Sequence, residues 1–275
     1  MSDLVAFAAT VHFPYVTAWP ERAPADLRSQ TMIGFRDLGN AIRDAAVETL
    51  VVFTSEHIVN LSPRLAPPFI IGTAAEHPTF PEPHFNLPLG PRGGDAALAN
   101  ELVGALYAAG FDPAHSSELR LDHGTTLPLA LMNVAPDVAI VPIVINSLFA
   151  PLPTLARTRA FGSAVARAIA VAPQRRRVGM LATGGLSHTV GAPDVARNDP
   201  AFDQRVIDAL VAGRLDDLCA LDDATLDAAG NGTHEIRNWI ALAAAAADWR
   251  PQIVNGIPFV SGWDTGVHQL VWRAA

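Results

Sequence analysis

The chain has 275 residues, a net charge of −8 and 50% hydrophobic residues, which is typical of a globular protein with a substantial core. All 19 basic residues are arginine, so chemistry that needs a lysine amine is excluded, including Schiff bases, pyridoxal anchors and phosphate-loop lysines. The single cysteine, Cys219, excludes intrachain disulfides, iron–sulfur clusters and cysteine-rich zinc sites and fits a reducing compartment, so we expect a cytoplasmic protein.

The charge pattern argues against nucleic acid and membranes as partners. Phosphate binding needs a concentrated basic face, and the densest basic cluster, the arginines at 175–177, is interpreted as part of a solvated loop. No secretory signal is evident at the N-terminus. The most apolar stretch, residues 138–156, contains Pro142, Pro151 and Pro153. It is therefore predicted to be a buried strand and a loop rather than a membrane span.

The order of apolar segments predicts the fold class. Four β-rich runs predict strands buried on both faces, at residues 5–11, 50–54, 138–146 and 178–183. Five segments with apolar residues three and four apart predict helices, at 26–48, 95–109, 155–171, 202–212 and 233–249. Residues 62–94 are rich in proline and glycine and predict a long ordered loop or a pair of irregular strands. The alternation predicts one α/β domain over residues 1–275, with helices covering a mostly parallel or mixed sheet.

Three of the nine histidines follow predicted strands. His12 directly follows the first run, His57 follows the second within Ser55-Glu56-His57-Ile58-Val59-Asn60, and His188 follows the last across Gly184-Gly185-Leu186-Ser187. The carboxyl ends of parallel strands share one edge of a sheet, so these imidazoles are expected to converge there. The histidines expected to be exposed to solvent, because they lie among prolines or in polar segments, are His77, His84, His115 and His268.

Two further segments add acidic side chains. In Leu121-Asp122-His123-Gly124, a turn-like segment, Asp122 would orient or charge a neighbouring imidazole. Glu235 follows a glycine-rich turn and opens a predicted helix, which Thr233 would cap and whose dipole favours an acidic residue. The neighbouring His234 is expected to point away from Glu235. Two neutral imidazoles and one carboxylate on one face of a metal leave three positions open, as in non-haem Fe(II) oxygenases.

Each of these residues also has a structural interpretation. A lone histidine beside an apolar strand is more often hydrogen bonded in the core than bound to a metal. Glu235 alone would be an acidic helix N-terminus, and Asp122 alone would be a turn former. No compact signature, such as two histidines four residues apart on a helix, decides between the two interpretations.

Five segments together resemble one known family. They are the first strand ending in His12, the segments 55–60 and 121–124, Gly184-Gly185-Leu186-Ser187-His188, and Thr233-His234-Glu235-Ile236-Arg237-Asn238-Trp239. In their order and separation they are similar to the class III extradiol ring-cleavage dioxygenases. The resemblance implies Fe(II) as the cofactor with His12, His57 and Glu235 as its ligands. It also implies that His188 is the acid/base histidine and that His123 with Asp122 forms a second active-site pair.

The resemblance further implies the reaction. A substituted catechol or trihydroxybenzene would bind with O₂, and both oxygen atoms would enter the product as the ring opens beside the diol. His188 would take a proton from a catechol hydroxyl and later return one. His123, held by Asp122, would hydrogen-bond the bound oxygen or a substrate oxyanion. Relatives are oligomeric, so a homo-oligomer is expected. Without lysine, arginine, backbone amides or hydroxyl groups would hold any substrate carboxylate.

Two alternatives stay open. His, His and Glu also suit catalytic zinc, so a zinc-dependent hydrolase or lyase on the same scaffold is a second hypothesis. A degenerate subunit that only binds a partner is a third, and the presence of all five polar positions argues against it. Metal content and the dependence of activity on O₂ would separate the first two.

Overall fold

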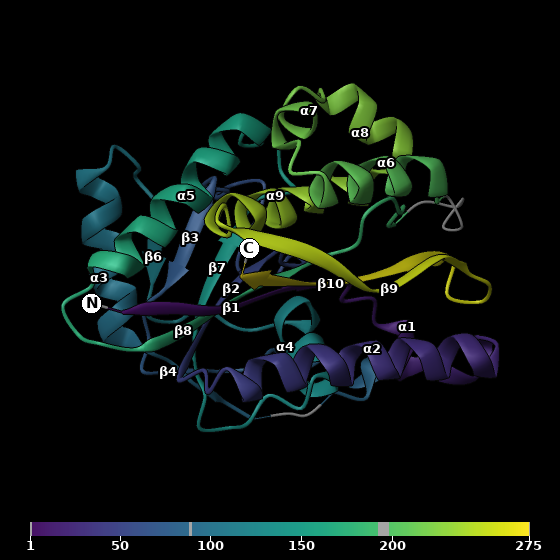
Figure 1. Cartoon of the computed structure of the whole chain (residues 1–275), viewed down its shortest axis with the longest axis horizontal. Coiled ribbons are helices and arrows are strands. Elements are labelled where there is room, and N and C mark those ends of the chain that lie inside the picture. Colours follow the sequence, from purple (N-terminus) through teal and green to yellow (C-terminus); the bar gives the residue numbers. More distant parts are fainter. Residues whose placement is uncertain (1, 88–89, 192–197, 275) are drawn as a thin grey trace.

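The computed structural model describes residues 2–87, 90–191 and 198–274. Its main sheet has eight strands in the order β6-β3-β7-β2-β8-β1-β10-β9 (Figure 1). Their bounds are β1 Asp3–Thr10, β2 Thr49–Thr54, β3 Phe69–Gly72, β6 Ala114–Ser116, β7 Ala139–Ile145, β8 Arg177–Thr183, β9 Trp249–Val260 and β10 Thr265–Ala274. The central strands β7, β2, β8 and β1 are parallel, while β3, β10 and β9 add antiparallel pairs. The sheet is therefore mixed with a parallel centre, as predicted.

Helices cover both faces of this sheet, so the domain has three layers (Figure 1). The helices on one face are α3 (Ala96–Ala108), α5 (Leu155–Val171), α6 (Pro200–Val211), α7 (Leu215–Cys219), α8 (Asp223–Ala229) and α9 (Ile236–Ala245). The other face carries α2 (Ala25–Asp44) and α4 (His123–Leu131). The short elements are α1 (Tyr15–Ala18), the 3₁₀ turns Pro20–Arg22, Pro83–Phe85 and Asn231–Glu235, and a two-stranded pair of β4 (Glu76–His77) and β5 (Arg92–Gly93). In the described ranges, no helix combines the length and apolarity needed to cross a bilayer.

Burial of both faces explains why the central strands are continuously apolar. In β2, Val51 and Phe53 pack in the core under α3, α5 and α9, whereas Leu50 and Val52 pack in the core beside α2 and α4. All four side chains are fully buried. Each contributes roughly 1.5 to 3 kcal/mol when it leaves water, so the sheet holds the strand ends in place for the polar residues that follow them.

Several elements differ from the sequence-based expectations. The predicted strands correspond to β1, β2, β7 and β8, and the first four predicted helices to α2, α3, α5 and α6, with small shifts at their ends. The fifth predicted helix begins later, because 231–235 form a 3₁₀ turn before α9. The sequence did not predict α4, which contains Gly124 and Pro128, or the β9–β10 hairpin. For residues 62–94 the sequence predicts a long loop or a pair of irregular strands. The short pair β4–β5 agrees with that expectation, but β3 is a buried strand of the main sheet that the sequence did not predict.

The interpretation of the arginine cluster as a solvated loop is wrong for Arg176. Its guanidinium is buried, with Nε 2.7 Å from Asp95 Oδ2 and a terminal nitrogen 3.4 Å from Glu101 Oε2. Asp95 is the N-cap of α3 and Glu101 lies within this helix, so both are far from the cluster in the sequence. Arg176 is therefore a structural cation that joins α3 to the start of β8.

Two of the four histidines expected in solvent are buried. His77 has no exposed surface, and His268 lies in β10 with its Nε2 3.4 Å from Oδ2 of buried Asp203. His84 and His115 are exposed, as predicted. The burial of His268 follows from the unpredicted hairpin, which places the C-terminal segment inside the sheet next to β1.

Close packing of α5 against α9 depends on Gly162. A Cβ atom there would lie 2.1 Å from the carbonyl oxygen of Ala241. We expect Gly162→Ala to lower the free energy of unfolding by about 1 to 3 kcal/mol, measured by urea denaturation. The control is Gly104→Ala in α3, where a Cβ would meet nothing within 4 Å. That variant should be neutral or more stable by up to about 1 kcal/mol, because alanine favours helix; equal losses in both would contradict the packing argument.

Candidate metal centre and active site

The predicted site residues meet where three adjacent parallel strands end. The registers of β1 and β2 with β8 bring the carboxyl ends of all three strands to one level. The chain continues from these ends into His12, His57 and His188, and Glu235 reaches the same place from the turn before α9. The convergence expected from the parallel order of the strands is therefore confirmed.

Glu235 lies between the histidines. Its Oε1 is 3.2 Å from Nε2 of His12 and 3.5 Å from Nε2 of His57, and its Oε2 is 3.8 Å from Nε2 of His188. The carboxylate is buried, and the backbone N–H of Gly185 donates to Oε2 at 2.7 Å. Adjacent ligands about 2.1 Å from one metal ion are roughly 3 Å apart. The distances from Glu235 Oε1 to the two imidazole nitrogens match this spacing.

Hydrogen bonds from α9 hold Glu235 against the sheet. The indole N–H of Trp239 donates to the carbonyl of Gly184 at 3.0 Å, and the amide of Asn238 donates to the carbonyl of Thr183 at 2.8 Å. A Cβ at Gly184 would lie 2.9 Å from Cβ of Glu235. Because Gly184 has a φ of 139° and no side chain, the end of β8 approaches Glu235 closely.

The turn before α9 differs from one expectation and confirms another. Thr233 does not cap the helix, and its buried Oγ1 has no hydrogen-bond partner among the described residues. The 3₁₀ turn moves the helix start beyond its reach. His234 points away from Glu235, as predicted, because Asp227 lies 2.9 Å from its Nε2 and Arg237 lies 2.7 Å from its Nδ1.

Glu56 shapes the loop that carries His57. Its buried carboxylate accepts hydrogen bonds from the backbone N–H groups of residues 58–61 at distances between 2.5 and 3.2 Å. Ile58 adopts a φ of 64°, which a β-branched residue rarely does. The four bonds stabilise this tight turn, and the turn directs His57 across the strand ends.

The expected pairing of Asp122 with His123 is wrong, because Asp122 orients His57 instead. Its Oδ2 accepts from the backbone N–H of His57 at 2.6 Å and lies 3.1 Å from Nδ1 of that ring, while Oδ1 caps α4 at Gly124. His123 is held by Glu82, which accepts its backbone N–H at 2.5 Å and lies 2.7 Å from its Nδ1. Both imidazoles therefore present Nε2 to the site, the orientation that a carboxylate on Nδ1 commonly gives a metal-binding histidine.

The buried charges shift one another's pKa values. Burial alone lowers the pKa of His57, but the charges and hydrogen bonds of Asp122 and Glu235 outweigh it and raise the pKa to about 10. Burial raises the pKa of Glu235, but His12 and His57 outweigh it and hold that pKa well below its usual range. The pKa of His123 is lowered, first by burial and then by the charge of His57. Without a metal, His57 is therefore cationic and His123 neutral at neutral pH.

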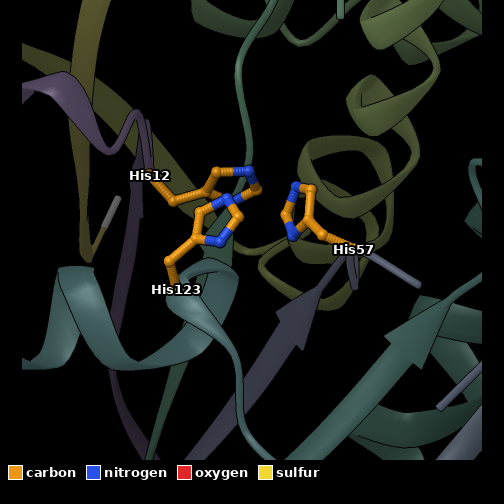
Figure 2. A group of neighbouring side chains, drawn as sticks. All are labelled: His12, His57 and His123. Atoms are coloured by element: carbon orange, nitrogen blue, oxygen red, sulfur yellow. The ribbon is translucent and has the colours of Figure 1, made fainter. Parts of the chain in front are cut away.

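Three imidazoles also form a cluster of their own. Figure 2 shows the rings of His12, His57 and His123 turned toward one another. One nitrogen of each ring lies within 4.8 Å of a nitrogen of each of the other two. This cluster shares His12 and His57 with the set that contains Glu235. Glu235 lies within 3.5 Å of both shared rings, and its negative charge offsets the charge of a divalent ion. These two properties favour Glu235 over His123 as the third ligand.

His188 is fixed by one hydrogen bond and two glycines. Its Nδ1 lies 3.1 Å from the carbonyl oxygen of Leu186, which can only accept, so Nδ1 is the hydrogen-bond donor and the neutral form of the ring has its lone pair on Nε2. A Cβ at Gly185 would lie 2.7 Å from Nδ1, and one at Gly232 would lie 2.2 Å from Nε2. The glycines leave the room that this ring orientation needs.

A buried carboxylate supports the loop of His188. Asp203 Oδ1 accepts the backbone N–H of Ser187 at 2.7 Å, and the amide of Asn198 donates to Oδ2 at 3.3 Å and to Ser187 Oγ at 2.9 Å. His268 lies beside the same carboxylate. The end of β8 is therefore tied to α6 and β10 directly next to the proposed acid/base group.

The imidazoles open onto a cavity of about 480 Å³, which is the size of a small-molecule site. Its polar part is lined by His12, His57, His123 and His188. The remainder is mainly aromatic and apolar, with Phe13, Tyr15, Phe85, Val190 and Trp263, together with Arg22 and Asp264. A planar aromatic molecule with polar groups on one edge fits this division.

Three acidic residues that support the site were not predicted from the sequence: Glu56, Glu82 and Asp203. Glu56 stands beside His57 in the sequence, but adjacency does not show that its carboxylate turns back onto the backbone. Glu82 lies 41 residues before His123 in a proline-rich segment, and Asp203 lies inside a helix. No spacing rule relates the last two to the histidines that they position.

Comparison with known proteins agrees with this geometry. A family model described as the catalytic LigB subunit of aromatic ring-opening dioxygenase matches residues 6–259. The 2,3-dihydroxyphenylpropionate/2,3-dihydroxicinnamic acid 1,2-dioxygenase of Mycolicibacterium smegmatis is 30% identical over 272 residues, covering 81% of this chain and 84% of that protein. The corresponding enzyme 1 of Dechloromonas aromatica is 32% identical over 245 residues, covering 73% and 77%.

A solved structure shares the fold over the whole length. The crystal structure of an uncharacterized protein from Escherichia coli K12 aligns with a TM-score of 0.59 at 16% identity, covering 97% of this chain and 99% of that one. At this identity the likeness concerns the fold alone. The family match, by contrast, spans nearly all of the strands and all of the predicted site residues. The chain belongs to the family of the catalytic LigB subunit of aromatic ring-opening dioxygenases.

Proposed function

We propose that the protein is a non-haem Fe(II)-dependent extradiol dioxygenase that inserts both atoms of O₂ into a substituted catechol or trihydroxybenzene. The observation that carries the proposal is the position of the Glu235 carboxylate, within 3.5 Å of Nε2 of both His12 and His57. The family and the names of the relatives support ring opening beside the diol.

The donor set fits Fe(II). His12, His57 and Glu235 offer two imidazole nitrogens and one carboxylate oxygen, the set found in Fe(II) oxygenases that keep positions open for substrate and O₂. His12 and His57 also line the cavity, so the open side would face a ligand. When bound, iron would hold the diol and O₂ side by side and allow electrons to pass between them. Asp122 would keep His57 turned toward the ion.

Two other histidines would handle protons and negative charge. The Nδ1–H group of His188 donates a hydrogen bond to the carbonyl oxygen of Leu186. Its Nε2 would therefore accept a proton from a substrate hydroxyl and return it during ring opening. The Nδ1–H group of His123 donates a hydrogen bond to the Glu82 carboxylate, so Nε2 of the neutral ring would accept a hydrogen bond from the substrate. Once protonated, His123 would donate to an oxygen that carries negative charge. The aromatic walls would exclude water around these transfers.

Oxygen consumption tests the proposal. We expect protein purified anaerobically and loaded with Fe(II) to take up O₂ with 2,3-dihydroxyphenylpropionate or a related catechol and to form a yellow ring-opened product. A chelator should abolish the uptake. Iron-loaded protein that consumes no O₂ with any of a broad panel of catechols and trihydroxybenzenes would overturn the proposal. Turnover by zinc-loaded protein without O₂ would favour a hydrolase or lyase.

Metal binding should release protons. His57 has a pKa of about 10 in the metal-free protein and must lose its Nε2 proton to bind an ion, so the ion and the proton compete. As the pH falls through 10, an increasing fraction of His57 is protonated, and the apparent affinity for the ion should weaken by up to about tenfold for each further pH unit. Calorimetric titration with Zn(II) near neutral pH, in two buffers of different ionisation enthalpy, should show about one proton released per ion. An affinity independent of pH would contradict this expectation.

A further inference from the structure

A free positive charge stands in the wall of the cavity. Among the described residues that line it, Arg22 is the only one besides the histidines that carries a cationic group. It belongs to the 3₁₀ turn Pro20–Arg22, ten residues after His12, on the segment that leaves β1 at the metal centre. The proposed reaction assigns no role to this arginine.

The side chain and backbone of Arg22 are both held in place. Its Cζ lies 4.6 Å from the ring centroid of Trp19 and 5.8 Å from that of Tyr15, distances typical of cation–π contacts. A Cβ at Gly262 would lie 2.3 Å from the carbonyl oxygen of Arg22, and the indole of Trp263 donates to the carbonyl of Trp19 at 3.2 Å. The turn is therefore packed directly against the segment that joins β9 to β10.

The guanidinium keeps its hydrogen-bond donors available. In the described part of the chain, Arg22 forms no ion pair, in contrast to Arg176 and Arg237, which pair with Asp95 and Asp223. Stacking occupies the face of a guanidinium and leaves the N–H groups at its edge free for a bidentate contact. A carboxylate is the partner whose geometry matches that edge.

We propose that Arg22 binds the carboxylate of an acidic side chain on the substrate, and that the protein selects catechols that carry such a group. The inference rests on the proposed function, because the catechol oxygens must occupy the imidazole side of the cavity for the ring substituent to reach Arg22. The volume of about 480 Å³ accommodates a ring and a short chain. The relatives, named for a dihydroxyphenylpropionate and a dihydroxycinnamic acid, act on substrates of this chemical class.

Asp264 is the competing recognition element. It also lines the cavity, and it forms no ion pair within the described ranges. An Asp264 site would select an ammonium group instead of a carboxylate. The structure favours Arg22, because the rings of Trp19 and Tyr15 fix the position of its guanidinium in advance. Asp264, by contrast, sits in a turn with a φ of 56° and lacks comparable contacts among the described interactions. Its negative charge should weaken the binding of an acidic substrate modestly.

Three catechols that differ only at the end of one side chain test the assignment. They are 3-(2,3-dihydroxyphenyl)propionate, its amide and the corresponding amine. We expect the iron-loaded protein to have a lower KM for the acid than for the amide or the amine. Arg22→Gln should raise the KM for the acid about 10- to 100-fold. The kcat for the acid, and both constants for the amide, should change little. Arg22→Lys should restore part of the affinity, Asp264→Asn should lower the KM for the acid, and the control Arg36→Gln, on the exposed face of α2, should change nothing.

Equilibrium dialysis without O₂ separates this inference from the proposed function. Suppose that no catechol is consumed, but that the protein binds the acid more tightly than the amide and Arg22→Gln removes that difference. This result would support the carboxylate site at Arg22 and overturn the proposed reaction. Equal losses for acid and amide in Arg22→Gln would overturn the assignment. A preference for the amine that Asp264→Asn abolishes would overturn it in favour of a cation site.

Discussion

Replacing Glu235 by alanine should remove iron binding and ring opening together. The carboxylate is the one anionic group within 3.5 Å of Nε2 of both His12 and His57 among the described contacts, and two neutral imidazoles alone hold a divalent ion weakly. We expect the iron content after anaerobic loading to fall from about one ion per chain to background, and turnover to fall by about 10³-fold or more. Metal analysis and the rate of O₂ uptake measure the two effects.

Parallel variants identify the third ligand. His12→Ala should behave like Glu235→Ala, whereas His123→Ala should retain iron and lose part of the rate, because His123 faces the substrate in our proposal. The exposed His115→Ala is the matched control for the loss of an imidazole. Iron retained by Glu235→Ala but lost by His123→Ala would show that three imidazoles bind the ion. Glu235→Gln keeps the size of the side chain but removes its charge. If this variant has an unchanged circular dichroism spectrum but no iron, the loss of iron results from the missing ligand and not from misfolding.

Replacing Asp122 should weaken iron binding less than replacing a ligand does. It contacts His57 but lies behind the ring, on the Nδ1 side. Asp122→Asn should therefore weaken iron binding about 10- to 100-fold, the usual effect of removing a carboxylate that orients a metal-bound histidine. An effect as large as that of Glu235→Ala would mean that Asp122 itself is a ligand.

The centre of the fold was predictable from sequence because burial on both faces leaves a simple signal. β1, β2, β7 and β8 read as continuous apolar runs, and their parallel order places His12, His57 and His188 at one edge. The β9–β10 hairpin gave no such signal. Its register shifts between Thr265 and Val267 and again between Gln269 and Leu270, which breaks the two-residue alternation that identifies a strand.

The candidate site was predictable only in part, because tertiary contacts decide which carboxylate meets which imidazole. Adjacency in the sequence suggested that Asp122 holds His123. In the structure Asp122 is the N-cap of α4 and His123 its first residue, so the two side chains leave the backbone in different directions. Glu82 then takes the expected role from a segment with no periodic pattern. Hydrogen bonds between distant segments leave no trace in local spacing.

Replacing His188 by asparagine should separate proton transfer from metal binding. His188 lies 3.8 Å from Oε2 of Glu235, farther than His12 and His57 lie from Oε1, and its Nε2 lone pair faces the site. We expect the variant to keep its iron, while kcat and kcat/KM fall together by about 10² to 10⁴-fold.

Gly232→Ala should give a smaller version of the same defect without removing the imidazole. The added Cβ would lie 2.2 Å from Nε2 of His188, so the ring must turn away from the position in which it accepts a proton. The iron content should stay near one ion per chain while kcat falls, because proton transfer fails when donor and acceptor leave hydrogen-bond distance. Two results would contradict the acid/base role: turnover that survives in His188→Asn, or iron that is lost from it, which would make His188 a ligand instead.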